Sequence, residues 1–161
     1  MNRTVEKHKF HWSQKEFLFS AISAFLLLAG SLFINYAAGN YSRRAASNSV
    51  TDIILDNLPI MDVEIIFIYG AILFVLFLAA VLLKEPRQIP FIVKSIALFV
   101  FIRAIFISLT HIGFIPEQPV MTTNIILRNL MFGADYFFSG HTGLPFLMAL
   151  SYWVSKHLRN I

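Results

Sequence analysis

The chain has 161 residues, of which 57% are hydrophobic and 14% are charged, and phenylalanine alone occurs 17 times. Because soluble domains carry about 25% charged residues, this composition argues against an ordinary soluble domain and indicates that lipid surrounds the chain. Cysteine is absent, which excludes disulfides and cysteine-ligated metal sites. The formal net charge of +4 matters less than the placement of the charges in the loops.

The first 16 residues form a basic arm that precedes a long apolar segment. Its cationic residues are Arg3, Lys7, Lys9 and Lys15. The apolar segment is too long for a signal peptide, and no convincing small-residue cleavage site follows it. His8 and His11 are spaced for one helical face, but two histidines alone make a weak metal site. We therefore expect a solvated cytoplasmic arm that binds no metal.

Four segments are long and apolar enough to cross a bilayer, whose core requires about 20 apolar residues in a helix. They comprise residues 17–39, 65–83, 91–110 and 137–155. Backbone exposed to lipid must satisfy its own hydrogen bonds, which favours helices in all four. The predicted fold is therefore an all-α polytopic transmembrane helix bundle.

Lysine and arginine residues gather in alternate loops. The arm, the loop after the second span and the C-terminal end hold most of them, whereas the loops at 40–62 and 112–136 hold only Arg43, Arg44 and Arg128. Since cytoplasmic loops are enriched in these residues, we expect both ends of the chain to be cytoplasmic. The start of the fourth span then meets the end of the third at the extracytoplasmic face.

A polar segment, Ser139-Gly140-His141-Thr142, opens the fourth span. Pro145 suits the first turn of a helix, so we expect the helix to start just before it, with Ser139 or Thr142 as N-cap. Free N–H groups at such a start favour phosphate, and glycine lets phosphate approach the backbone. His141 would stand beside this phosphate, able to donate or accept a proton. An ordinary N-cap followed by an interfacial histidine explains the same residues.

Arg103 lies inside the third span, about two turns or roughly 12 Å before its outer end. An ionised group at this depth usually faces the protein interior, where a guanidinium suits phosphate. The alternative is snorkelling to the interface. Nearer the other end of this span, Lys94 is expected to snorkel.

Three sequence motifs lie, in a particular order along the chain, at the ends of predicted spans. Residues 133–142 run from a Gly/Asp segment that contains Asp135 into Ser-Gly-His-Thr. Residues 101–116 form an arginine-containing span that ends in a proline-marked loop, and residues 58–62 hold a Leu-Pro/Asp motif. Together they resemble the sphingomyelin synthase-like branch of the type 2 phosphatidic acid phosphatase superfamily.

The resemblance implies two-step phosphoryl transfer through a phosphohistidine. His141 would be the general acid that protonates the leaving alcohol, and Asp135 would support the site. The phosphate-binding residues would be Arg103, Ser139, Gly140 and Thr142. The scheme implies no metal and no cofactor, since histidine and arginine supply the charge stabilisation.

The chain departs from the family, whose members have two further spans that carry the nucleophilic histidine. His157 lies on the wrong side of the membrane for this role, and the family pattern does not give it to His111. We therefore expect residues 17–161 to form a C-terminally incomplete domain with four of six spans. Whether this chain alone is an enzyme stays open.

The leading hypothesis is an integral-membrane protein that acts on lipid phosphate esters at the extracytoplasmic face. Water as acceptor makes it a phosphatase, and a lipid hydroxyl makes it a phospholipid phosphotransferase. The expected partners are membrane lipids and a lipid phosphate substrate, with no nucleic acid. The alternative is a non-catalytic membrane protein, or an inactive fragment, that retains part of the phosphate site.

Overall fold

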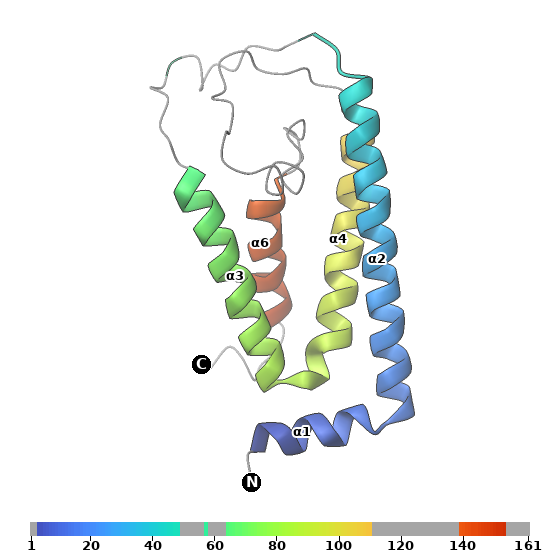
Figure 1. Ribbon diagram of the computed structural model, residues 1–161, viewed down its shortest axis with the longest axis vertical. Helices are drawn as coiled ribbons and strands as arrows, with labels where there is room; N and C mark the ends of the chain where they lie inside the picture. Colours follow the sequence, from blue (N-terminus) through green and yellow to red (C-terminus); the bar gives the residue numbers. More distant parts are fainter. Residues whose placement is uncertain (1–2, 49–56, 58–63, 111–138, 154–161) are drawn as a thin grey trace.

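A computed structural model describes residues 3–48, 57, 64–110 and 139–153, and every regular element among them is a helix. The elements are α1 (Arg3–Trp12), α2 (Lys15–Arg44), α3 (Glu64–Lys84), the 3-10 helix η1 (Pro86–Gln88), α4 (Ile89–Leu109) and α6 (Gly140–Trp153). In Figure 1, α2, α3, α4 and α6 extend along one direction, and α1 lies across one end of them. The all-α prediction is confirmed for this part of the chain.

Two of the described helical segments, Lys15–Arg44 and Pro86–Leu109, are long and apolar enough to cross a membrane. They correspond to the first and third predicted spans. The second predicted span matches α3, whose apolar stretch is the shorter segment Tyr69–Lys84. The fourth matches α6, which has 14 residues, and both ends of that predicted span lie outside the described residues.

Helix α2 continues beyond the segment that apolarity marks. The first loop was predicted to start at residue 40, but Arg43 and Arg44 form the last turn of α2, and Ala45 N–H donates to the Tyr41 carbonyl at 2.9 Å. The predicted boundary was wrong because apolar side chains mark the membrane, whereas the helix is held by backbone hydrogen bonds. Arginines also suit the negative end of a helix dipole.

The tightest packing in the described residues lies between α2 and α4, which run parallel (Figure 1). Residues of α2 that are buried or half-buried recur at alternating spacings of three and four. They are Ala21, Ala24, Leu28, Ser31, Asn35, Ala38 and Ser42. Buried residues of α4 recur in the same way, at Val93, Ala97, Val100, Ala104 and Ile107. Small residues at this spacing let two helix backbones approach closely, which is how helices associate in lipid.

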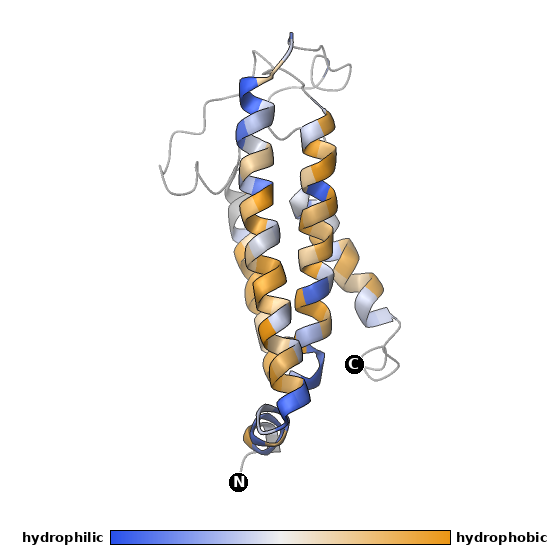
Figure 2. Cartoon of the chain, turned by 90° about the vertical axis from the view of Figure 1, so that its right-hand side faces the viewer, coloured by the Kyte–Doolittle hydropathy of each residue, from blue (hydrophilic) through white to orange (hydrophobic). Residues whose placement is uncertain are grey.

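The outward faces of the same helices are bulky and apolar. Phe19 is 76% exposed and Phe33 is 74% exposed, while Ser31 and Asn35 are buried against α4. Figure 2 shows hydrophobic residues over most of the length of both helices. Polar groups inside and large hydrophobic groups outside reverse the pattern of a soluble protein, so an apolar medium suits this surface.

Polar bonds join α2 to α4 near both ends of their contact. Ser42 Oγ donates to the Thr110 carbonyl at 3.2 Å, near the far end of both helices. Nearer the start of α4, Lys94 Nζ donates to Ser20 Oγ at 3.1 Å. Ser42 and Thr110 are 68 positions apart in the sequence, whereas Ser20 and Lys94 are 74 positions apart. Relative to the alignment that the first pair sets, the Lys94 side chain therefore reaches six residues further toward the start of α2. Lys94 therefore extends toward the N-terminal end of α4 and bonds to a hydroxyl of α2 there.

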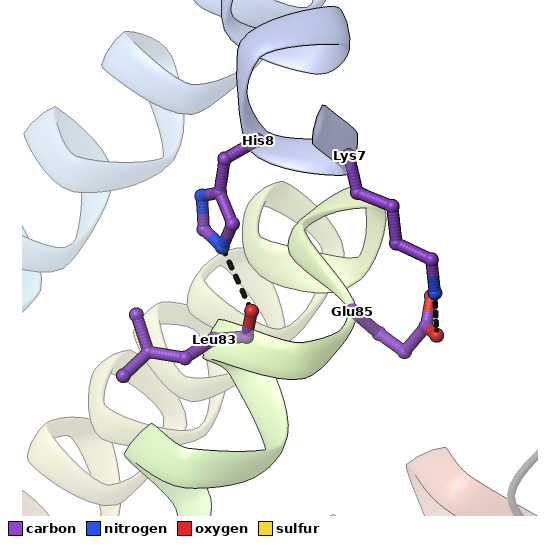
Figure 3. A network of polar contacts seen from close by, with 4 residues as sticks. All are labelled: Lys7, His8, Leu83 and Glu85. Carbon is purple, nitrogen blue, oxygen red and sulfur yellow. Dashed lines mark hydrogen bonds and ion pairs between the residues drawn. The ribbon is translucent and has the colours of Figure 1, made fainter. Parts of the chain in front are cut away.

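The N-terminal arm is a helix bound to the bundle. Lys7 of α1 forms an ion pair with Glu85, and His8 Nε2 lies 2.7 Å from the carbonyl oxygen of Leu83 (Figure 3). A carbonyl only accepts, so Nε2–H is the donor and caps the last turn of α3. The arm, which was expected to be solvated, is therefore only partly so, because two of its polar side chains bond to the α3–η1 corner.

Candidate functional site

Arg103 of α4 lies beside the first residue of α6. A Cβ atom placed on Gly140 would lie 3.8 Å from Arg103 Nε. Two residues predicted from separate motifs thus come together at one point. A guanidinium stands next to the N-terminus of a helix, where backbone N–H groups are not used within the helix.

This meeting point is recessed below the end of α4. Arg103 precedes Leu109, the last residue of α4, by six positions, or about 9 Å at 1.5 Å per residue. Helix α6 accordingly begins lower than α4 ends, as Figure 1 shows. The two helix ends, which were expected to meet, therefore lie at different levels as far as the described residues go.

A close contact between Gly143 and Phe99 sets this depth. A Cβ atom on Gly143 would lie 2.4 Å from Phe99 Cζ, a separation that real side chains do not show. Only glycine lets the Phe99 ring reach the α6 backbone. Phe99 and Arg103 are four residues apart on one face of α4, so the first turn of α6 rests on both: Gly143 on the ring and Gly140 on the guanidinium.

Ser139 is the N-cap of α6, which settles the choice between the two predicted caps. Its Oγ accepts hydrogen bonds from the Thr142 N–H and the Thr142 hydroxyl, both at 3.4 Å. Its carbonyl accepts the first helical bond, from Gly143 N at 3.0 Å. The side-chain bonds are long for their type, and both side chains are exposed.

His141 is exposed in the first turn of α6. Its backbone adjoins Gly140 and so lies next to Arg103. Pro145 was expected in this first turn, but it lies inside the helix, at the sixth position. Because proline has no N–H, α6 lacks the hydrogen bond that residue 145 would otherwise make to the His141 carbonyl.

Asn35 of α2 is a site residue that the sequence analysis missed. Its Oδ1 accepts a hydrogen bond of 2.8 Å from Arg103 Nη1, and the residue is only 6% exposed. Arg103 therefore points into the bundle and contacts α2 through Nη1 while Nε lies beside α6. The available signal was an amide in a repeat of small residues, since a polar side chain buried in such a repeat needs a partner.

Several predicted features lie outside the described residues. They are Asp135, His111, His157, the segment at 58–62 and the proline-marked loop after residue 110. Among the residues that the structure describes, no group of three or more His, Asp or Glu side chains could hold a metal ion.

Comparisons of the chain with protein-family models, with curated proteins and with solved structures give no match.

Proposed function

We propose that this chain is an integral-membrane protein that binds the phosphate group of a lipid phosphate ester, as part of a phosphatase or phosphotransferase of the family that it resembles. The observation that carries the proposal is the placement of Arg103 Nε beside Gly140. Guanidinium groups and helix N-termini each bind phosphate, and here the two converge from different helices.

The recessed position strengthens this site. Hydrogen bonds to charged groups contribute about 1.5–3 kcal/mol each, and more where water is scarce. Gly140 lets an oxyanion reach the backbone, with Ser139 and Thr142 hydroxyls in the same turn. In the proposed reaction, His141 protonates the leaving alcohol.

The depth of the site also favours a lipid as ligand. A phosphate held about 9 Å below the end of α4 brings its ester chain among the membrane helices. We propose that α3 and α6 belong to two further spans beside α2 and α4, in a four-span polytopic bundle. A lipid phosphate would then bind with its acyl chains beside the outward apolar side chains.

Charge placement supports an orientation for this bundle. The end that carries α1 also carries exposed Lys15, Lys84 and Arg87. By the positive-inside rule this end is cytoplasmic. The start of α6 is then extracytoplasmic, and the phosphate site opens to that side.

A non-catalytic membrane protein is the second candidate, and one observation favours it. The bond from Arg103 to buried Asn35 gives the arginine a structural role, because it joins α4 to α2. Such a protein would keep the arginine for packing and would bind no phosphate.

Binding of short-chain phosphatidate to the purified chain in detergent separates the two candidates. We expect saturable binding, measured by phosphorus NMR, that inorganic phosphate competes away. Arg103→Lys should abolish the binding because the planar fork is lost. Lys94→Gln is the matched control, since it removes another cation of α4, near the N-terminal end of that helix. Absence of binding, or an equal loss in both variants, would contradict the proposal.

Catalysis is tested separately, by phosphate release from the same lipid. We expect binding without turnover from these 161 residues, because the nucleophilic histidine of the family has no counterpart among the shared motifs. Turnover that disappears in His111→Ala would assign the nucleophile to His111. Turnover that survives His111→Ala but is lost in His141→Ala would contradict the two-histidine scheme.

A further inference from the structure

Helix α1 turns polar residues toward the bundle and aromatic residues away from it. Its half-buried side chains are Thr4, Lys7, His8 and His11. By contrast, Phe10 is 62% exposed and Trp12 is 40% exposed. A short helix in water would be expected to bury its aromatic residues first, so the exposure of Phe10 and Trp12 needs an explanation.

The placement of the side chains around the axis of α1 supplies an explanation. At about 100° per residue, Trp12 and Val5 lie on one flank of the half-buried face, and Phe10 lies on the opposite flank. Lys9 and Glu6 point away from the bundle, between the two flanks. Apolar groups thus extend sideways along the end of the bundle, while charged groups extend outward from it.

The position of α1 matches that arrangement. It lies across the ends of α2 and α3 (Figure 1), at the level where apolar helices leave a bilayer. Lipid there surrounds the bundle on its sides, which are the directions of the aromatic flanks. Helices parallel to a membrane surface bury their aromatic residues at the boundary between headgroups and acyl chains.

Bonds to the rest of the chain hold α1 in this orientation. Lys7 pairs with Glu85, and His8 binds the Leu83 carbonyl (Figure 3). The ring of Trp12 meets that of Phe17, at the start of α2, edge to face with centroids 5.3 Å apart. Helix α1 is therefore already folded, with its aromatic flanks facing sideways, and does not need to fold on contact with lipid.

The exposed charge at this end is mainly positive. The exposed cationic residues of α1, the start of α2 and the α3–η1 corner are Lys9, Lys15, Lys84 and Arg87, and the exposed acidic residues are Glu6 and Glu16. A basic helix at a membrane surface attracts anionic headgroups, by about 1 kcal/mol per lysine or arginine near the surface.

We infer that α1 is an interfacial helix that binds the anionic lipid headgroups of the adjoining leaflet, with Phe10 and Trp12 inserted at the acyl boundary. This inference uses no residue of the phosphate site, so each stands without the other.

Fluorescence of Trp12 in lipid nanodiscs tests it. The chain has two tryptophans, and Trp153→Phe leaves Trp12 as the single probe. We expect brominated phosphatidylglycerol to quench Trp12 more strongly than brominated phosphatidylcholine at the same mole fraction. Replacing both Lys9 and Lys15 by glutamine should bring the two quenching efficiencies together, whereas Arg44→Gln, at the other end of α2, should leave them apart.

Three results would overturn the inference. Quenching by aqueous iodide without quenching by either lipid would place α1 in water. Equal quenching by both lipids in the unmodified arm would remove the anionic preference. Protection from iodide and from both lipids would show that protein, such as a second copy, covers the flanks. The single variants Lys9→Gln and Lys15→Gln serve if the double variant loses its helical circular dichroism.

Discussion

Arg103 Nη1 donates a 2.8 Å hydrogen bond to Asn35 Oδ1 across the contact between α2 and α4. Because a guanidinium is planar, fixing Nη1 also fixes the direction of the opposite edge, which carries Nε. That Nε is the atom near Gly140. Asn35 thus orients Arg103 toward the start of α6 and is a positioning residue for the proposed phosphate site.

Substitutions of Asn35 should separate stability from phosphate binding. Asn35→Ala leaves the half-buried guanidinium without this acceptor and should lower the free energy of unfolding by about 1–3 kcal/mol. Asn35→Asp restores an acceptor and should keep stability near the wild-type value. Its charge competes with phosphate for Arg103, so affinity for phosphatidate should fall about tenfold or more, as one lost charged bond implies.

Unfolding in mixed detergent micelles and phosphorus NMR titration measure these two quantities. Ser31→Ala is the control, because among the described residues the Ser31 hydroxyl bonds within its own helix, to Leu28 O. An aspartate variant that binds phosphatidate as tightly as wild type would show that Asn35 does not act through Arg103.

Gly143→Ala should destabilise the contact between α4 and α6. The new methyl group would overlap the Phe99 ring, and overpacking of this kind costs about 1–3 kcal/mol. The same measurement on Gly30→Ala provides the control, since beyond its own stretch of helix no described residue lies within 4 Å of a Cβ atom there. Gly30→Ala should be neutral or stabilising by up to about 1 kcal/mol. Partial recovery in Gly143→Ala combined with Phe99→Leu would confirm the contact.

Gly140→Ala, unlike Gly143→Ala, should not destabilise the protein. Its Cβ atom would meet Arg103 Nε at an ordinary 3.8 Å, so stability should be unchanged or slightly higher. The methyl group would, however, stand between the guanidinium and the helix N-terminus, where phosphate is proposed to bind. We expect phosphatidate affinity to fall at least about tenfold, as loss of one charged hydrogen bond implies. Unchanged affinity would place the ligand elsewhere.

Membrane orientation can be measured with single cysteines, because the chain has none of its own. Asn48→Cys, beyond α2, should react with an impermeant reagent in intact cells. Ser13→Cys, between α1 and α2, should react only after permeabilisation. Both positions are exposed in the structure. Reaction at Ser13→Cys alone in intact cells would reverse the proposed orientation.

The sequence predicted the individual helices better than the contacts between them. Apolar length located the helices of the first and third predicted spans, and Ser139 was one of the two residues predicted as the cap of α6. Asn35 was not recognised, since its role depends on which residue of α4 lies opposite. The recessed start of α6 was also missed, because it follows from how Phe99 and Gly143 pack, and sequence periodicity says nothing about relative depth.

The bonds between α2 and α4 also bear on how the bundle could move. Asn35–Arg103 and Ser42–Thr110 both join residues 68 apart, so they set the same alignment of the two helices. Sliding one helix past the other by a single residue, about 1.5 Å, would disturb both bonds and the small-residue repeat together. Helices α2 and α4 are therefore expected to move as one rigid unit, because no single contact between them can shift alone.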